Sequence, residues 1–187
     1  MDDLEIIKEN VQPLRQGRKI DELKAALTHD INENDNRREM IRQKFENDIK
    51  QSKNDDEIFE TYYKYINWIQ QNYPGGGIKI KFAEILEKCI ETFYKNEKYQ
   101  NDERMLSIFL IYTNLVTTPI QFFKVVFKQN FGKKLSRFYI EWSYHLEMQH
   151  KYKKAIQVIK IGIENGAEPL SSLTRTLNDL EVRTMRF

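Results

Sequence analysis

The sequence predicts an all-α protein, an irregular tetratricopeptide-like solenoid of about three helix pairs with a C-terminal capping helix. Apolar side chains recur at helical spacing over most of the 187 residues. Only four prolines and seven glycines interrupt them, so long helices are expected. Aromatic residues make up 12% of the chain, which favours bulky packing between helices.

The first 54 residues are predicted to precede the repeats. Residues 1–19 read as an extended polar leader. Residues 20–27 place Ile20, Leu23 and Leu27 on one face of a short amphipathic helix. Residues 32–54 are very polar and predict a solvated helix that touches the body along one edge. The expected organisation is therefore a leader at 1–19, short helices at 20–54 and a helical repeat domain at 55–187.

The first predicted helix pair covers about residues 56–95. Asp55 or Asp56 can cap its first helix, and Pro74 with the glycine run 75–77 ends that helix. Its second helix carries one unbroken apolar face that includes Cys89.

The second pair is expected at about residues 102–129. Asn101 and Asp102 are positioned to cap a helix that runs to about Thr117. Thr118 offers a capping hydroxyl, and Pro119 follows at the first position of the next helix. Both helices are apolar around most of their circumference, which predicts that neighbours cover them on several sides.

The third pair is expected at about residues 133–165, with Gly166 at its end. Pro169 then opens a last helix with leucines on one side and polar residues on the other. A helix with one apolar and one polar face is suited to close the end of a solenoid. We expect Trp68 and Trp142 to serve packing, and a peptide-binding role for either is the minority interpretation.

The composition points away from several classes of protein. The net charge is +2 and charges of both signs alternate, which argues against a dedicated nucleic-acid surface. No segment has the length of a signal peptide's apolar region or of a membrane span, so a soluble protein is expected. The single cysteine, Cys89, indicates a reducing nuclear or cytosolic environment.

The sequence contains no recognisable catalytic constellation, so we expect no enzyme activity and no cofactor within these residues. His29, His145 and His150 lack companion ligands at metal-binding spacing, and surface histidines are expected. Cys89 lies on an apolar helix face, which favours a packed thiol over a nucleophile. YPGGGIK, residues 73–79, has neither the spacing nor the Ser/Thr of a phosphate-binding loop.

The leader contains the tripeptide Lys8-Glu9-Asn10, followed closely by a proline and a glycine in KENVQPLRQGR. Its three polar side chains are not expected to contribute to a hydrophobic core. By itself such a short motif is weak, and the beginning of a frayed helix is the alternative interpretation.

The sequence around the tripeptide resembles that of a known protein family. KENVQPLRQGR resembles the first K-E-N motif of the BubR/Mad family of spindle-checkpoint proteins. YINWIQQNYPGGG is similar to the family's Y-x-x-W…YP-x-GG signature. FGKKLSRFYIEWSYHLEMQHKYKKAIQVIKIGIENGAEPLSSL resembles its last repeats. The similarity runs from about residue 4 to residue 180.

This resemblance implies a tetratricopeptide-like domain and a role as a pseudo-substrate inhibitor. It implies that Lys8, Glu9 and Asn10 bind the WD-repeat co-activator of the anaphase-promoting complex, inside a complex that includes a HORMA-domain checkpoint protein. A peptide of an outer-kinetochore scaffold is a further implied partner. The implied location is nucleus, kinetochore and cytoplasm. The rival interpretations are the kinetochore-docking domain of a Bub-type kinase and a general peptide-binding adaptor.

Overall fold

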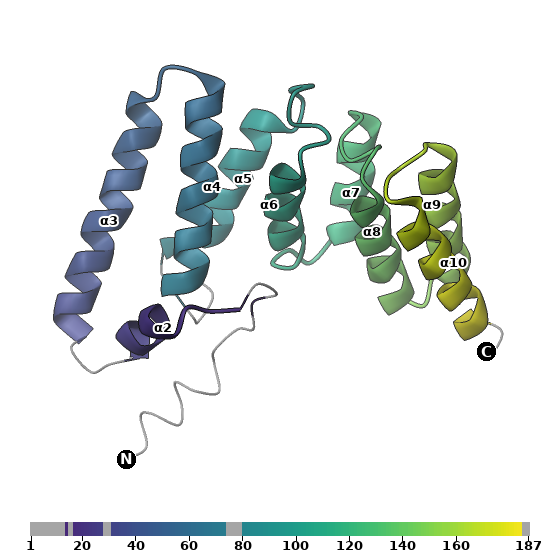
Figure 1. Ribbon diagram of the computed structural model, residues 1–187, viewed down its shortest axis with the longest axis horizontal. Helices are drawn as coiled ribbons and strands as arrows, with labels where there is room; N and C mark the ends of the chain where they lie inside the picture. Colours follow the sequence, from purple (N-terminus) through teal and green to yellow (C-terminus); the bar gives the residue numbers. More distant parts are fainter. Residues whose placement is uncertain (1–13, 15–16, 28–30, 74–79, 185–187) are drawn as a thin grey trace, which may run out of the picture. The chain divides into compact units, whose positions relative to one another are not determined.

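The computed structural model describes residue 14 and residues 17–27, 31–73 and 80–184. The regular secondary structure in these ranges is α-helical, apart from a 3₁₀ residue at Ile80 and one isolated β-bridge between Leu135 and Glu168 (Figure 1). The predicted all-α class is therefore confirmed. The chain divides into two compact units, Met1–Cys89 and Ile90–Phe187, which are described separately. None of the helices in the described ranges combines the length and apolarity that a membrane-spanning helix requires.

The first unit contains α2 (Ile20–Leu27), α3 (Ile31–Gln51), α4 (Asp55–Asn72) and the first part of α5 (Phe82–Phe93). The helices α3 and α4 lie side by side, and α2 also contacts α4 (Figure 1). The ring of Phe45 on α3 stacks on Tyr65 at 5.0 Å and lies 5.9 Å from Trp68. The polar helix α3 thus packs through one thin edge, as its sequence predicts.

The predicted cap of α4 was wrong by one residue. Asn54 is the N-cap, with φ −140° and ψ 159°, and its side chain accepts a hydrogen bond from the amide of Glu57 at 2.9 Å. Asp55 and Asp56 already belong to the first helical turn. In the first turn their carboxylates interact favourably with the positive end of the helix dipole, but they do not cap the helix.

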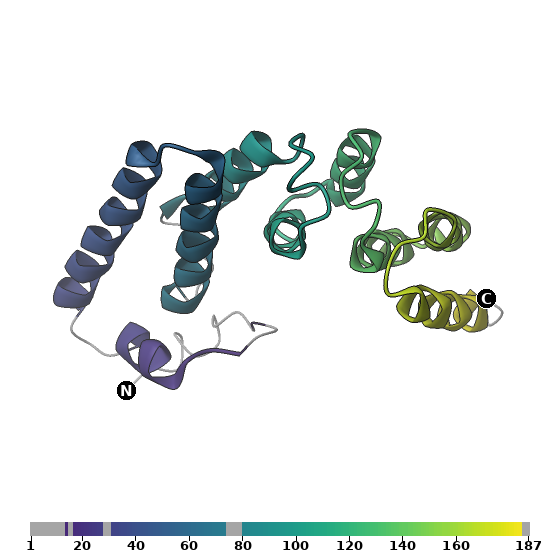
Figure 2. The same ribbon diagram turned by 45° about the horizontal axis from the view of Figure 1, so that its top comes forward.

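The second unit contains the end of α5, then α6 (Glu103–Thr113), α7 (Pro119–Lys128), α8 (Ser136–Met148), α9 (Tyr152–Glu164) and α10 (Leu170–Thr184). The helix α8 packs against α7, α9 and α10, and α9 also packs against α10. Figure 2 shows α6, α8 and α10 in one row and α7 and α9 in another. The predicted helix pairs and the last helix beside them are present.

An aromatic cluster fills the centre of this second unit. Phe123 on α7 contacts Phe109 on α6 at 5.1 Å and stacks on Trp142 of α8 at 6.0 Å. Phe138 lies within 5.2 Å of Phe123, and all four side chains are buried. The packing role predicted for Trp142 is confirmed.

The boundary between α6 and α7 corrects two expectations. Asp102 does cap α6, but the helix ends at Thr113 and not near Thr117. The β-branched residues that follow Thr113 are exposed or half-exposed and precede Pro119, which disfavours helical backbone before it. Pro119 occupies the first turn as expected, yet the Thr118 hydroxyl makes no capping bond, because a ψ of 53° departs from the usual capping geometry.

Candidate partner-binding site

The residues predicted to bind a partner, Lys8, Glu9 and Asn10, lie outside the described part of the chain. The structure describes how the chain immediately after them is held. The amide of Gly17 donates to the carbonyl of Leu14 at 2.9 Å, which forms a turn before α2. The candidate site is therefore built from the contacts of residues 14–27 with α3 and α4.

Arg18 attaches the end of the leader to the C-terminus of α4. Its guanidinium donates to the backbone carbonyls of Gln70 and of Gln71, the latter at 3.2 Å. These carbonyls belong to the last turn of α4, where the helix dipole favours a cation. Partial burial lowers the pKa of Arg18 from its ordinary value, but the group stays protonated.

A second set of bonds joins the start of α2 to the same helix end. The side-chain amide of Gln71 accepts from the backbone amide of Lys19 and donates to the carbonyl of Gly17, both at 3.2 Å. The side chain of Asn72 donates to the carboxylate of Glu22 at 3.4 Å. Several bonds from one helix end therefore fix where the leader meets the folded chain.

The helices α2, α3 and α4 line a cleft of about 320 Å³. Carboxylates from α2 form part of its lining, guanidinium groups from α3 another part, and an indole and an aliphatic side chain complete it. Its lining residues are Asp21, Glu22, Arg37, Arg38, Ile41, Trp68 and Asn72. Charges of both signs beside an indole suit a polar polypeptide segment more than a purely apolar ligand.

Arg38 is held in this cleft by two contacts. Its guanidinium lies over the ring of Tyr73, 5.5 Å from the centroid, and 3.5 Å from the carboxylate of Asp35. Burial is the main cause of the raised pKa of Tyr73, and the nearby arginines oppose the increase. These two contacts hold the guanidinium of Arg38 at the cleft.

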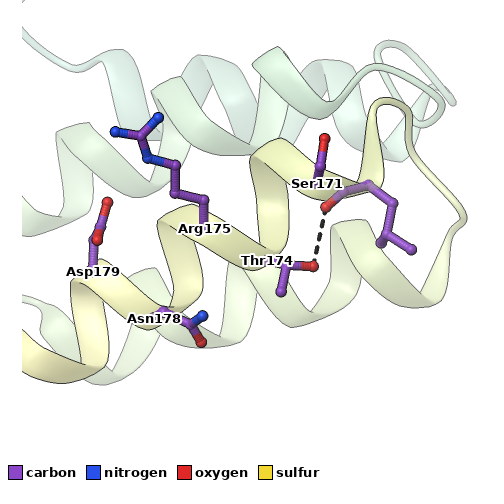
Figure 3. Close-up of a pocket in the computed structure, with 6 residues that line it drawn as sticks. Ser171, Thr174, Arg175, Asn178 and Asp179 are labelled. Carbon is purple, nitrogen blue, oxygen red and sulfur yellow. Dashed lines mark hydrogen bonds between the residues drawn. The ribbon is translucent and has the colours of Figure 1, made fainter.

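A wider hollow of about 620 Å³ lies along the outer side of α10 (Figure 3). Its lining comes from successive turns of this one helix. The Thr174 hydroxyl donates to the carbonyl of Leu170 at 3.1 Å, and Arg175, Asn178 and Asp179 are exposed. This polar outer side, opposite the buried Leu173 and Leu180, matches the capping helix predicted from the sequence.

The cysteine and the histidines, which the sequence predicts to be unreactive, lie in different environments. Cys89 is fully buried, and burial raises the pKa of its thiol to about 12, so the prediction of a packed thiol is confirmed. His145 is half-buried between Phe123 and Tyr144, and burial lowers the pKa of its imidazole. His150 is exposed, and His29 lies outside the described residues. The described ranges hold no cluster of three or more potential metal ligands.

Sequence reasoning missed Arg18 and Gln71 as anchoring residues. Arg18 stands inside KENVQPLRQGR, but its partners on α4 follow about fifty residues later. No local pattern predicts a bond across that separation. The only available signal was an arginine shortly before a short amphipathic helix, a position that many surface arginines share.

The fold and these anchors define a class of protein, a tetratricopeptide-like helical repeat preceded by a leader attached to its first helices. The sequence profile of "Mad3/BUB1 homology region 1" matches residues 40–163. The chain therefore belongs to the Mad3/BUB1 family of spindle-checkpoint proteins.

Three relatives illustrate the similarity. "Mitotic checkpoint serine/threonine-protein kinase BUB1 beta" of Mus musculus is 33% identical over 97% of this chain and 17% of its own length. "Mitotic spindle checkpoint protein BUBR1" of Arabidopsis thaliana is 30% identical over 97% of this chain and 46% of its own length. "Mitotic spindle checkpoint component mad3" of Schizosaccharomyces pombe is 28% identical over the whole chain and 61% of its own length. The chain thus spans less than two thirds of each relative.

Solved structures show the same fold. A chain of "Crystal Structure of Mitotic Checkpoint Complex" superposes with a TM-score of 0.89 at 26% identity, covering 100% of this chain and 88% of that chain. The "conserved N-terminal domain of the mitotic checkpoint component BUB1" superposes with a TM-score of 0.72 at 26% identity, covering 79% and 78%. The matched region is the family's tetratricopeptide-like N-terminal domain and not a kinase domain.

Proposed function

We propose that this chain is a pseudo-substrate inhibitor of the anaphase-promoting complex in the spindle assembly checkpoint. In this proposal Lys8, Glu9 and Asn10 bind the WD-repeat co-activator of that complex, and a HORMA-domain checkpoint protein joins the assembly. The chain then acts in the nucleus, at kinetochores and in the cytoplasm, and itself catalyses nothing. The observation that carries the proposal is the attachment of Arg18 to α4, eight residues after Asn10.

The tripeptide alone gives too little affinity, so an anchored leader is required. Hydrogen bonds to charged groups contribute about 1.5–3 kcal/mol each, so three supply about 5–9 kcal/mol. Association costs about 4–15 kcal/mol. A second contact surface must add affinity, and the leader must hold the two surfaces within reach of one partner.

The attachment of the leader to α4 limits how far the tripeptide can lie from the folded chain. Asn10 precedes Leu14 by four residues, so covalent geometry keeps it within about 14 Å of Leu14. A partner that binds the tripeptide therefore also approaches α2 and the cleft beside Trp68. The mixed charges of that cleft offer the second contact that the energetics require.

The extent of the alignments supports a role for the leader but does not separate the two branches, because "Mitotic checkpoint serine/threonine-protein kinase BUB1 beta" of Mus musculus also aligns over 97% of this chain. The BUBR1 and mad3 relatives align over 97–100% of this chain, including the leader. "Mitotic checkpoint serine/threonine-protein kinase BUB1" of Mus musculus aligns over 64% of it. The leader is the part that the pseudo-substrate function needs.

The test is inhibition of ubiquitination by the purified chain together with direct binding to the co-activator propeller. We expect Lys8→Ala/Glu9→Ala/Asn10→Ala to abolish tight binding and inhibition while leaving helicity and the melting temperature unchanged. The control is Lys44→Ala/Lys50→Ala on the exposed side of α3, which should inhibit normally even though it lowers the net charge by two. If the triple variant inhibits at wild-type concentrations, the pseudo-substrate proposal fails.

The second candidate function is docking to a kinetochore scaffold peptide, as an N-terminal domain of a Bub-type kinase. The structural likeness to the BUB1 domain, with a TM-score of 0.72, favours it. A chain that binds such a peptide and never the propeller would support this candidate and contradict the first.

A further inference from the structure

The helices α7 and α9 present an unusually basic surface. Residues 119–164, from the start of α7 to the end of α9, contain nine lysines and arginines but only three acidic residues, Glu141, Glu147 and Glu164. Glu141 and Glu147 lie on α8, and Glu147 is bound by the guanidinium of Arg183 at 2.6 Å. The small net charge of the whole chain therefore conceals a strong local excess of positive charge.

The two helices stand in the same row, on one side of α8 (Figure 2). Tyr139 of α8 connects them, because its ring lies 6.0 Å from Phe127 of α7 and directly against Gly162 of α9. The opposite sides of α7 and α9 therefore face away from α8. We call the exposed residues on those sides the lysine face: Gln121, Lys124, Val125 and Lys128 on α7, and Lys153, Lys154, Gln157, Lys160 and Glu164 on α9.

The charges of the lysine face are largely uncompensated. Among the described residues, the ammonium groups of Lys124, Lys128 and Lys153 have no hydrogen-bond or ion-pair partner. Lys160 approaches Glu181 only to 3.9 Å, with both side chains about half exposed. Lys133 adds a further ammonium beside α7, 5.3 Å from the centroid of the Phe127 ring. Gathering like charges on a surface costs stability, and a partner of opposite charge would relieve that repulsion.

We propose that the lysine face binds an acidic segment of a partner protein, rich in Asp and Glu. Charge complementarity is the main argument for this occupant. Val125 is 55% exposed among the lysines and offers an apolar contact, while Gln121 and Gln157 offer amides to a peptide backbone. An acidic polypeptide segment can pair its carboxylates with the lysines, its apolar side chains with Val125 and its backbone with the two glutamines.

A nucleic acid fits this surface less well. Proteins that bind single strands place exposed aromatic rings between their basic groups, and base recognition relies heavily on arginine. None of the exposed residues of α7 and α9 is aromatic or an arginine. The acidic-segment proposal is also independent of the K-E-N motif, so either proposal can fail without the other.

Isothermal titration calorimetry on the whole chain tests the proposal, with an Asp/Glu-rich peptide of about 12 residues as the probe. We expect Lys124→Glu/Lys128→Glu to weaken binding about tenfold or more, and added salt to weaken the wild-type complex. Lys124→Gln/Lys128→Gln, which removes charge without reversing it, should give a smaller loss. The matched control is Lys44→Glu/Lys50→Glu on α3, with the same change in net charge and affinity within about twofold of wild type.

Three results would overturn the proposal. The first is no binding of the peptide by the wild-type chain. The second is an equal loss in the α7 and α3 variants, which would mean that only the net charge matters. The third is tighter binding of a single-stranded oligonucleotide that the α7 variant abolishes, which would assign the face to nucleic acid. Circular dichroism of each variant confirms that it is folded.

Discussion

Gly162 on α9 lies directly against the ring of Tyr139 on α8, and a Cβ atom added to it would stand 2.8 Å from the Tyr139 Cγ. The ring has little freedom to move. Its hydroxyl donates to the carbonyl of Lys133 at 3.0 Å and accepts from the side chain of Asn165 at 2.9 Å. The glycine is therefore a packing requirement of this helix pair.

Gly162→Ala sets two effects against each other. Alanine favours the helix by about 1 kcal/mol over glycine, whereas overpacking a core costs about 1–3 kcal/mol. Because Tyr139 is fixed at both its ring and its hydroxyl, we expect a net loss of about 1 kcal/mol in urea denaturation. Gln157→Ala on the exposed side of α9 is the control and should change stability by less than about 0.5 kcal/mol. A more stable Gly162→Ala protein would contradict this account.

The caps of α6 and α7 give a paired prediction. Asp102 accepts from the backbone amides of Arg104 at 2.7 Å and Met105 at 3.3 Å, whereas the Thr118 hydroxyl makes no capping bond. Asp102→Ala should therefore cost about 1 kcal/mol, and Thr118→Ala much less. Urea denaturation of both variants measures the difference, and equal losses would show that the capping bond of Asp102 contributes nothing.

The Asp102 cap should also depend on pH. Burial alone would raise the pKa of Asp102, but hydrogen bonds from Arg104 and Met105 outweigh it and lower the pKa. The contribution of Asp102 is therefore present above its unfolded pKa, near 4, and lost as the pH falls below that value. The stability difference between wild type and Asp102→Ala should shrink in acid.

Cys89 should be chemically silent in the folded protein. Because burial raises the pKa of its thiol to about 12, almost no thiolate exists at pH 9. We expect iodoacetamide to label native protein very slowly at this pH and urea-unfolded protein rapidly, as measured by intact mass. Fast labelling without denaturant would be incompatible with the buried position.

The same raised pKa has a consequence for stability. The fold favours the neutral thiol, so the contribution of Cys89 is fully present below its unfolded pKa of about 8.5 and is lost as the pH rises above that value. Cys89→Ala should therefore show a smaller decline in stability between pH 8 and pH 10 than wild type, measured by urea denaturation.

Arg18→Ala should loosen α2 from α4 without unfolding either unit. The variant loses the bonds to the Gln70 and Gln71 carbonyls, a loss of about 1 kcal/mol because the group is partly exposed. Hydrogen exchange of the α2 amides should accelerate. If the proposed function holds, binding to the co-activator should weaken although Lys8, Glu9 and Asn10 are intact. Lys19→Ala, whose side chain is 75% exposed, is the control.

The sequence predicted the helices well because their apolar faces are local patterns. Residues such as Leu86, Cys89 and Phe93 recur at helical spacing and are all fully buried. The end of α6 was predicted too late because apolar residues continue beyond Thr113. Hydrophobicity alone could not reveal that Leu115 is 41% exposed.

The candidate site was less predictable. The tripeptide was recognised by resemblance, but the bonds of Arg18 and Gln71 join residues about fifty positions apart. The lysine face was also missed, since its residues come from two helices separated by α8. Counting charges along the chain does not show which of them share a surface.

Each compact unit contains one of the chain's two tryptophans. Trp68 is half-buried beside Phe45 and Tyr73, whereas Trp142 is 6% exposed within the aromatic cluster. The protein thus carries two built-in optical reporters, and the more buried indole should emit at shorter wavelength. Replacing either tryptophan with phenylalanine leaves one emitter, so the melting of each unit can be followed by its own fluorescence.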